Sequence, residues 1–401
     1  MAKKILIIDD SALMRRVISD IIKQSDDYEV AAIAKDGLEG FDLIVSNPDM
    51  YSAIILDINM PKMNGLELLE KLQKNRIEQT VIVVSTVAKE GAKETIRALE
   101  LGAFDFVTKP ENYIETKGEA FKTRIHEMLD VATNSGLHSV HIRRKSVDNT
   151  SYLNRTNIAE RSLLRTAAQR STGNESLLDF RRKTQQISAA TANRQIIDSA
   201  KFSGIKPGKS KIVALACSTG GPKSLQQVIP LLPANLDAPV VLVQHMPAGF
   251  TASLAQRLDE MSDITVKEAD DGEELVKGTV YIAPGGRHLR VARNGGKHYI
   301  KLSDEPAVEG LRPCANLMYN SLENSTYDEL TCVVLTGMGA DGTNGIKGLA
   351  ARHKKIHVIA QNQDTCVVYG MPKSIINSGL ADSVVPLSQV AEEITKNVGV
   401  S

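Results

Sequence analysis

The chain has 401 residues, of which 42% are hydrophobic and 24% charged, and its formal net charge is zero. This length predicts two or three domains, and the balanced charge argues against a general nucleic-acid binder. No apolar run approaches the roughly 18 residues of a membrane span, and the first residues do not form a signal peptide, so we expect a cytoplasmic protein without membrane insertion. The four cysteines are scattered without a CxxC pair, which predicts reduced thiols rather than disulfides or a metal site. They are Cys217, Cys314, Cys332 and Cys366.

Residues 1–130 alternate apolar runs with segments of helical periodicity. Strands are predicted at 4–8, 30–34, 53–56, 80–84 and 104–107, and helices at 12–25, 37–45, 65–73, 92–101 and 120–132. Five repeats of a strand followed by a helix predict a parallel, doubly wound α/β sheet with right-handed crossovers.

Polar side chains end four of these predicted strands. They are Asp9 with Asp10, Asp57, Ser85 with Thr86, and Lys109. Because parallel strands point the same way, these positions converge on one edge of the sheet. Crowded carboxylates repel one another unless a cation joins them, and ligation by oxygen alone suits Mg²⁺, while a lysine and a hydroxyl beside them would complement a phosphoryl group. Each aspartate alone could simply begin a turn, but the full set in this order favours a phosphoryl site.

Residues 131–206 break the alternation and are rich in Ser, Thr, Asn, Arg and Gln. Residues 131–201 hold 12 lysines and arginines against 5 aspartates and glutamates, a net charge of +7. This composition predicts a long, basic, flexible linker. The simplest interpretation is a solvated tether, and the alternative is a docking segment for an acidic partner or for a domain interface.

Residues 207–401 return to the α/β alternation. Strands are predicted at 212–216, 240–243, 264–267, 279–283, 331–335 and 357–360, and helices at 225–232, 251–261 and 345–352. The connecting loops are rich in glycine. We expect a second doubly wound parallel-sheet domain whose loops gather at one edge of the sheet.

The turn Ser218-Thr-Gly-Gly221 lies between the first of these strands and a helix. Such a turn raises a side chain at the carboxyl edge of the sheet and points free backbone N–H groups at whatever binds there. Two chemistries fit: Ser218 is a nucleophile beside an oxyanion hole, or the loop cradles a phosphate. His245 follows the next strand and Asp341 lies in a glycine-rich loop after a later one.

A histidine after a strand or an aspartate before a glycine is often purely structural. Their convergence with Ser218 on one edge favours a triad of nucleophile, base and orienting acid. The chain order of serine, histidine and aspartate differs from that of the α/β-hydrolases, so this turn is not the elbow of that fold.

The first part of the chain, about residues 1–130, resembles the receiver domain of two-component response regulators. The resemblance is carried by Asp9-Asp10, Leu56-Asp57-Ile-Asn59-Met-Pro61-x-x-Asn-Gly65, Ser85-Thr86 and Lys109-Pro110. It implies a flavodoxin-like (βα)5 fold in which Asp57 accepts a phosphoryl group, Lys109 neutralises that group, and the hydroxyl of Ser85 or Thr86 switches toward it. Ser85 follows the apolar run directly and is favoured. The implied Mg²⁺ ligands are Asp9, Asp10, Asp57 and the backbone carbonyl of Asn59.

Residues 208–395 resemble the protein-glutamate methylesterase domain of bacterial chemotaxis. The motifs are Ser218-Thr-Gly-Gly-Pro, Gln244-His245-Met-Pro, Gly278-Thr-Val-Tyr-Ile-Ala-Pro-Gly-Gly-Arg-His288-Leu, Leu335-Thr-Gly-Met-Gly-x-Asp341-Gly and Gln363-Asp-Thr-Cys-Val-Val-Tyr-Gly-Met-Pro372. A receiver ahead of this domain matches the arrangement of chemotaxis response-regulator methylesterases. The resemblance implies hydrolysis of glutamyl γ-methyl esters on chemoreceptors, often with deamidation of receptor glutamines.

The resemblance also implies roles and partners. Ser218 would attack the ester, His245 would be base and then acid, and Asp341 would orient the histidine. Backbone N–H groups near Thr219 and Met338 would form the oxyanion hole. The esterase would need no cofactor, and the expected partners are a histidine kinase of the chemotaxis system and the methylated cytoplasmic domains of chemoreceptors. Until Asp57 is phosphorylated, the receiver would cover the edge that bears Ser218.

Three features depart from the family pattern. Asn316 stands where many members carry aspartate, which leaves fine substrate contacts open, and Cys217 precedes the serine where a small residue is usual. The linker is longer than the usual connector, so docking of the receiver could be looser. His288 is expected to be structural or to line the substrate site.

Three other functions stay open at this point. The second domain could bind a partner without catalysis, or the same esterase could act outside chemotaxis. A DNA-binding response regulator is the third, and the lack of a helix-turn-helix pattern and of a basic recognition helix argues against it.

Overall fold

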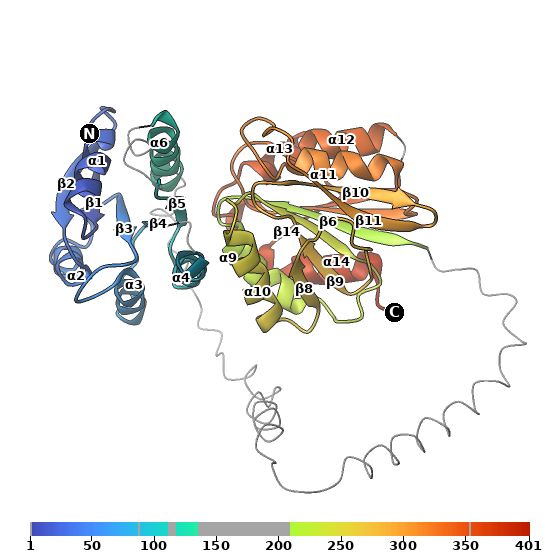
Figure 1. Ribbon diagram of the computed structural model, residues 1–401, viewed down its shortest axis with the longest axis horizontal. Helices are drawn as coiled ribbons and strands as arrows, with labels where there is room; N and C mark the ends of the chain where they lie inside the picture. Colours follow the sequence, from blue (N-terminus) through green and yellow to red (C-terminus); the bar gives the residue numbers. More distant parts are fainter. Residues whose placement is uncertain (1, 87–88, 111–117, 135–208, 353) are drawn as a thin grey trace, which may run out of the picture. The chain divides into compact units, whose positions relative to one another are not determined.

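The computed structural model of the chain describes residues 2–86, 89–110, 118–134, 209–352 and 354–401. It contains an amino-terminal and a carboxy-terminal α/β domain, each described by itself below (Figure 1). The predicted linker, residues 131–206, lies outside the described residues except for its first four. Those four are helical, because the last helix of the first domain, α6 (Glu119–Asn134), continues past the predicted boundary at 130 and buries Ala132.

The amino-terminal domain is a five-stranded parallel sheet in the order β2-β1-β3-β4-β5. Its strands are β1 (Lys3–Ile8), β2 (Tyr28–Ala34), β3 (Ala53–Asp57), β4 (Val81–Ser85) and β5 (Asp105–Thr108). One face packs against α1 (Ala12–Ile22) and α6, and the other against α2 (Gly37–Ser46), α3 (Gly65–Lys74) and α4 (Lys89–Glu100). Cover on both faces explains why the strands are continuous apolar runs. The predicted flavodoxin-like (βα)5 fold is confirmed.

The carboxy-terminal domain is built on a seven-stranded parallel sheet in the order β14-β13-β12-β6-β7-β9-β8. Its strands are β6 (Lys211–Cys217), β7 (Val240–Gln244), β8 (Thr265–Glu268), β9 (Thr279–Ile282), β12 (Glu329–Val334), β13 (Ile356–Gln361) and β14 (Ser383–Val385). One face packs against α9 (Gly221–Val228), α10 (Phe250–Met261) and α14 (Val390–Val398). The other packs against α11 (Ala315–Ser321), α12 (Thr343–Ala351), α13 (Met371–Asn377) and the antiparallel hairpin of β10 (His288–Asn294) and β11 (Lys297–Ser303). The predicted doubly wound parallel sheet is confirmed.

Several elements differ from the sequence prediction. The helix predicted at 225–232 begins at Gly221 and ends at Val228, because Pro230 has no backbone N–H to continue it and a short 3₁₀ segment, η2 (Ile229–Leu231), follows. The hairpin β10–β11 was not predicted, although Gly295-Gly296 between two alternating runs is a turn signal. The remaining 3₁₀ segments are η3 (Leu322–Asn324), η4 (Gln363–Thr365) and η5 (Leu387–Gln389).

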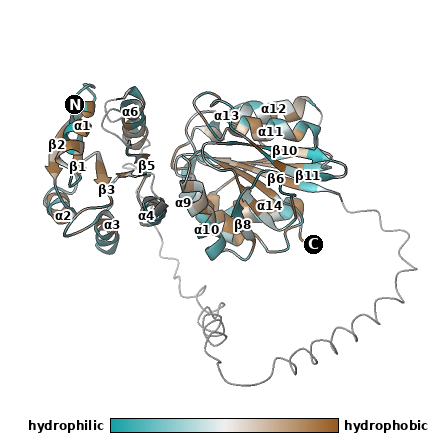
Figure 2. Cartoon of the chain, in the orientation of Figure 1, coloured by the Kyte–Doolittle hydropathy of each residue, from teal (hydrophilic) through white to brown (hydrophobic). Residues whose placement is uncertain are grey.

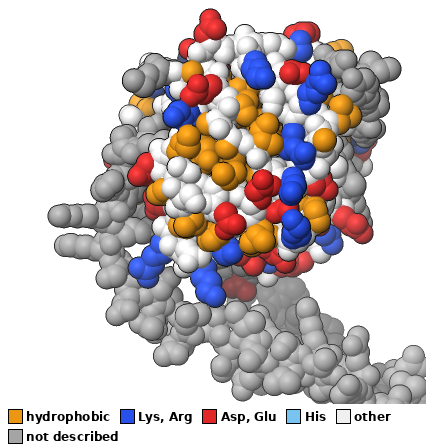
Figure 3. Space-filling model, turned by 90° about the vertical axis from the view of Figure 1, so that its left-hand side faces the viewer, with side chains coloured by type: hydrophobic (Ala, Val, Ile, Leu, Met, Phe, Trp, Pro, Cys, Tyr) orange, Lys and Arg blue, Asp and Glu red, His pale blue; other side chains and the backbone are white. Residues whose placement is uncertain are grey.

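Hydrophobic residues concentrate on the strands and on the helix faces that pack against them, and hydrophilic residues on the outward faces (Figure 2). In Figure 3, apolar side chains gather among charged ones on the side of the amino-terminal domain that faces the viewer. The large apolar side chains most exposed in this domain are Leu13, Ile33, Leu38 and Val45. Across the residues that the structure describes, no helix combines the length and apolar character needed to cross a membrane.

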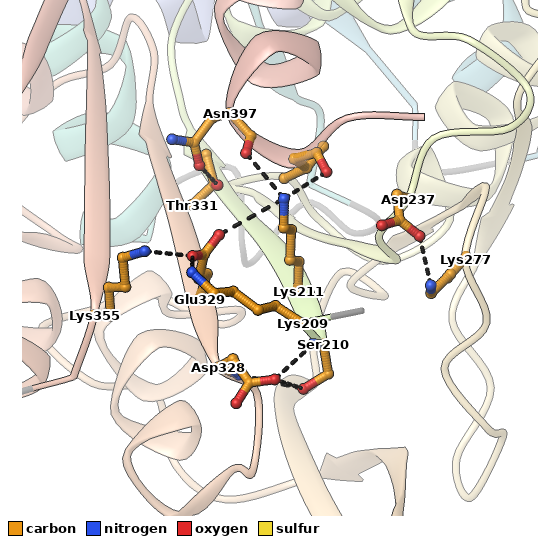
Figure 4. Close-up of polar contacts among 11 residues, drawn as sticks. Lys209, Ser210, Lys211, Asp237, Lys277, Asp328, Glu329, Thr331, Lys355 and Asn397 are labelled. Carbon is orange, nitrogen blue, oxygen red and sulfur yellow. Dashed lines mark hydrogen bonds and ion pairs between the residues drawn. The ribbon is translucent and has the colours of Figure 1, made fainter. Parts of the chain in front are cut away.

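A cluster of polar contacts holds the amino ends of the central strands of the second sheet (Figure 4). Glu329, the first residue of β12, pairs with Lys209 at 2.7 Å, with Lys211 at 3.6 Å and with Lys355. The Lys211 ammonium also donates to two backbone carbonyls at the end of α14, at 2.9 and 3.3 Å. Hydrogen bonds from Lys209 and Lys355 lower the pKa of Glu329 to about 2. The cluster therefore ties β6, β12, β13 and α14 together where the described part of this domain begins.

Replacing Glu329 by glutamine should weaken this cluster. We expect E329Q to lower the free energy of unfolding at neutral pH by on the order of 1–2 kcal/mol. The expected loss is modest because two of the lysines are well exposed, so that solvent screens their attraction to Glu329. The pKa of the carboxyl is depressed in the folded state. Its contribution is therefore present above the usual pKa of 4.5 and is lost as the pH falls toward about 2.

Thermal unfolding of wild type and E329Q between pH 7 and pH 2.5 measures this contribution, and the gap between them should close as the pH falls. The control is E323Q, since Glu323 forms an ion pair of 3.6 Å with an exposed arginine and should matter little. A gap that does not change with pH would contradict the prediction.

Candidate functional sites

The carboxyl edge of the first sheet brings together three aspartates and a lysine. Carboxylate oxygens of Asp9, Asp10 and Asp57 lie within 4.8 Å of one another. The Lys109 ammonium is 2.7 Å from Asp57 Oδ2 and 3.0 Å from Asp9 Oδ2. Asp9 and Asp57 are buried and Asp10 is exposed. Hard oxygen ligands at this spacing fit Mg²⁺, which prefers carboxylates and water.

Burial and charge oppose each other at this edge. Burial raises the pKa of Asp57, and the Asp9 carboxylate raises it further, although Lys109 works in the opposite direction. Burial alone would lower the pKa of Lys109, but attraction to Asp57 and Asp9 outweighs it and the pKa is raised. Lys109 is therefore charged and available to pair with an anion.

The end of β4 supplies the two candidate hydroxyls. Ser85 is buried, and its hydroxyl accepts a hydrogen bond of 2.6 Å from Thr95 and donates one of 3.3 Å to the Gly91 carbonyl. The side chain of Thr86 is exposed. The backbone N–H of Lys109 donates to the Ser85 carbonyl at 2.7 Å, so Ser85 lies beside the lysine.

The loop from β3 to α3 contacts the backbone of Asp57 closely. A Cβ atom at Gly65 would lie 2.4 Å from the Asp57 carbonyl oxygen, so only glycine fits where α3 begins. Asn59, two residues past Asp57, is exposed, and its side chain donates to Glu94 at 3.1 Å.

Ser218 lies directly after β6, in the turn that begins α9. Its backbone N–H donates to the Thr336 carbonyl at 3.0 Å, and its carbonyl accepts from the Gly221 N–H at 2.7 Å. Gly220 has a φ of +76°, which favours glycine. A Cβ atom at Gly337 would lie 2.8 Å from Ser218 Cβ. The turn is therefore fixed by close contacts on both sides.

His245 and Asp341 meet at the same edge of the second sheet. His245 Nε2 lies 2.8 Å from Asp341 Oδ2, and both side chains are largely buried. Since an ionised carboxylate only accepts, Nε2 carries the proton and Nδ1 of the neutral ring is free to take one. Within the described residues the Ser218 hydroxyl makes no hydrogen bond. Hydrogen bonds between a nucleophile and its base often tighten only when substrate binds.

The Asp341 carboxylate also holds the start of α11. It accepts backbone N–H bonds from Ala315 at 2.6 Å, Asn316 at 2.9 Å and Gly342 at 2.9 Å. Burial alone would raise the pKa of Asp341, but the His245 contact and the N–H groups of Ala315 and Asn316 hold it below its usual value. Asp341 is therefore ionised and fixed in orientation.

Asn316, in α11, accepts hydrogen bonds from the start of the next helix, α12. Its Oδ1 accepts from the N–H groups of Gly342 at 3.0 Å and Gly345 at 2.8 Å, at the start of α12. Asp341, just before α12, thus caps α11, while Asn316 in α11 caps α12. Asn316, the residue that departs from the family pattern, therefore contacts the loop that carries Asp341.

Two backbone N–H groups near Ser218 have no hydrogen-bond acceptor among the described residues. Those of Thr219 and Met338 donate to no residue within the described ranges, whereas the adjacent Gly337 N–H donates to Val368. Free N–H groups on two loops beside a serine are what an oxyanion hole requires.

Sequence reasoning gave no role to Gln244, the last residue of β7. Its side chain lies 2% exposed and hydrogen-bonds to the backbones of both Ser218 and His245. The available signal was an amide at the end of an otherwise apolar strand.

Cys217 is fully buried, and burial raises the pKa of its thiol, so it is not a second nucleophile. His288 is also fully buried, with Nε2 3.0 Å from the Pro306 carbonyl, which agrees with a structural role.

Comparisons with known proteins agree across the chain. A family model described as response regulator receiver domain matches residues 5–117, and one described as CheB methylesterase matches residues 213–394. A Desulfotalea psychrophila protein named protein-glutamate methylesterase/protein-glutamine glutaminase is 37% identical over 398 residues, 98% of each chain. A Bacillus subtilis protein of the same name is 36% identical over 397 residues, again 98% of this chain and 98% of the relative. The crystal structure of the Thermotoga maritima CheB methylesterase catalytic domain is 46% identical, with a TM-score of 0.45, and covers 47% of this chain and 99% of that one.

Removing the Asn316 side chain tests the reciprocal capping. Asn316→Ala leaves the Gly345 N–H without an acceptor and removes one of the two acceptors of the Gly342 N–H, and we expect the free energy of unfolding to fall by about 1–2 kcal/mol. Asn320→Ala, an exposed asparagine in the same helix, is the control and should change it by less than about 0.5 kcal/mol. Urea unfolding of both variants measures the effect, and equal losses would contradict it.

Proposed function

The chain belongs to the protein-glutamate methylesterase/protein-glutamine glutaminase family, and we propose that it hydrolyses glutamyl γ-methyl esters on chemoreceptors under the control of its receiver domain. The observation that carries the catalytic assignment is the buried contact of His245 with Asp341, on the sheet edge that bears Ser218. Deamidation of receptor glutamines, the second activity in the relatives' name, follows the same acyl chemistry with ammonia as the leaving group.

In the proposed mechanism the Ser218 hydroxyl oxygen attacks the ester carbonyl carbon. His245 Nδ1 takes the hydroxyl proton, because Nε2 is held by Asp341. The carbonyl oxygen becomes an oxyanion and accepts hydrogen bonds from the free N–H groups of Thr219 and Met338. The C–O bond to the methoxy group then breaks, the proton on Nδ1 passes to it, and methanol leaves an acyl-enzyme.

Water completes the cycle by the same route. His245 Nδ1 takes a proton from water as the hydroxide oxygen adds to the acyl carbon, and the proton then returns to Ser218 as the acyl bond breaks. The product is the glutamate carboxylate. Throughout, the ionised Asp341 stabilises the imidazolium and keeps the ring from turning, which is why its lowered pKa matters.

The receiver is proposed to accept a phosphoryl group on Asp57 from a histidine kinase of the chemotaxis system. Asp9, Asp10, Asp57 and the Asn59 carbonyl would hold Mg²⁺, which neutralises charge when bound. Lys109 would then pair with the phosphoryl oxygens. The buried hydroxyl of Ser85, beside Lys109, is the favoured switch over the exposed Thr86.

Phosphorylation would shift an equilibrium between a state in which the receiver limits access to Ser218 and one in which it does not. The proposed substrates are the methylated cytoplasmic domains of chemoreceptors, so both partner classes would be met in the cytoplasm. No cofactor is proposed for the esterase, and no nucleic-acid or membrane-inserted partner.

Ser218→Ala tests the esterase directly. Removing the nucleophile should lower demethylation of a methylated receptor fragment by about 10³-fold or more while thermal unfolding stays unchanged. Receptor methylation is followed by mass spectrometry after incubation with wild type or variant. Full demethylation by S218A would show that the second domain is not this enzyme.

Asp57→Ala tests the control by phosphorylation. Acetyl phosphate with Mg²⁺ should raise methanol release by wild type and leave that of D57A without response, because the acceptor carboxylate is missing. Asp49→Ala, at an exposed aspartate of the same domain, should respond as wild type does. Wild-type activity that is equal with and without the phosphoryl donor would rule out the proposed control.

A further inference from the structure

The side chain of Gln244 connects the segments that carry the nucleophile and the base. Gln244 ends β7, and its Nε2 donates to the backbone carbonyl of Ser218 at 3.0 Å and to that of His245 at 3.1 Å. It is 2% exposed, so both hydrogen bonds are shielded from water. One NH₂ group thus fixes the distance between the residues that have to exchange a proton.

Only one orientation of the carboxamide fits this position. Two carbonyl oxygens face Nε2, and turning the amide over would place Oε1 against both of them with no proton between. Oε1 is held from the other side by Cys217, whose Sγ lies at 3.0 Å. Burial raises the pKa of the Cys217 thiol, so the sulfur keeps the proton that it donates.

The surrounding backbone packs closely around the Gln244 carboxamide. Cys217 and Gln244 are direct neighbours in the parallel pairing of β6 with β7, and the His245 N–H continues that ladder to the Cys217 carbonyl at 3.1 Å. A Cβ atom at Gly221 would lie 2.0 Å from Gln244 Oε1 and 3.0 Å from Cys217 Sγ. The glycine at the start of α9 therefore makes space for the carboxamide.

We propose that Gln244 is a positioning residue for the esterase: its carboxamide, oriented by the Cys217 thiol, aligns Ser218 with His245. The proposal rests on the function proposed above and deepens it. Gln244 contacts only backbone atoms of these two residues, so it exchanges no proton with substrate. Its loss acts on the alignment of the serine and the imidazole rather than on the chemistry of either.

Gln244→Met is the main test, because methionine has a similar length and no polar hydrogen. In the full-length protein with acetyl phosphate and Mg²⁺, we expect kcat for methanol release from a methyl-esterified receptor fragment to fall by about 10- to 100-fold. KM should change by less than about threefold, since no substrate contact is removed. Covalent labelling of Ser218 by a fluorophosphonate, followed by intact mass, should slow in parallel.

Thr331→Val is the matched control. Thr331 is 1% exposed, and its hydroxyl donates to Asn397 at 2.6 Å at the opposite edge of the same sheet. T331V should lower the melting temperature as Q244M does but leave kcat and labelling unchanged. If Q244M does not fold, Gln244→Glu replaces it, since a carboxyl of the same shape has at most one proton to donate to the two carbonyls.

The outcomes separate this proposal from the proposed function. A kcat of Q244M or Q244E within twofold of wild type overturns it, as do equal losses of kcat in Q244M and T331V, or a rise of KM alone. If wild type releases no more methanol than S218A, the esterase function fails instead. The labelling rate then still measures how well Ser218 and His245 are aligned, and an unchanged rate in Q244M overturns the proposal.

Discussion

The Asp341 carboxylate is the interaction on which the second domain's chemistry depends. It is largely buried, where an unpaired charge would be costly, yet its pKa lies below the usual value because His245 and backbone N–H groups at the start of α11 surround it. The same bonds that keep it charged also fix its direction. The orientation of the histidine is therefore a consequence of how two short helices begin, with Asn316 completing the pair of caps.

The two domains use the same sheet topology to hold a buried aspartate in two different electrostatic environments. Both gather polar groups at the carboxyl edge of a parallel sheet, where strands end together. At Asp57 the neighbours are another buried aspartate and a lysine, and burial prevails, so the pKa is raised. At Asp341 the neighbours are hydrogen-bond donors, and the pKa is lowered. The first arrangement suits an added cation and phosphoryl group, and the second suits a permanent negative charge beside an imidazole.

Both sheets could be predicted from the sequence because buried parallel strands are continuous apolar runs that end in polar residues. For the same reason, residues at strand ends, such as Asp57 and His245, can be singled out as candidate site residues without coordinates. The roles of Gln244 and Asn316 were not predicted, because each depends on a backbone group that is distant in the sequence. Gln244 contacts the carbonyl of Ser218 and Asn316 contacts the N–H of Gly342, each 26 residues away along the chain. The hairpin β10–β11 was missed because it lies outside the strand–helix alternation that guided the prediction.

The most direct test of the account is the position of the proton on the His245 ring. Two-bond ¹H–¹⁵N spectra of the ¹⁵N-histidine-labelled protein distinguish the two neutral tautomers, and the spectrum of H245Q identifies the signal among the eight histidines. The contact between Nε2 and Asp341 predicts a proton on Nε2 and an unprotonated Nδ1. A proton on Nδ1 would contradict the account, because the nitrogen assigned as the base could not then accept the proton of Ser218.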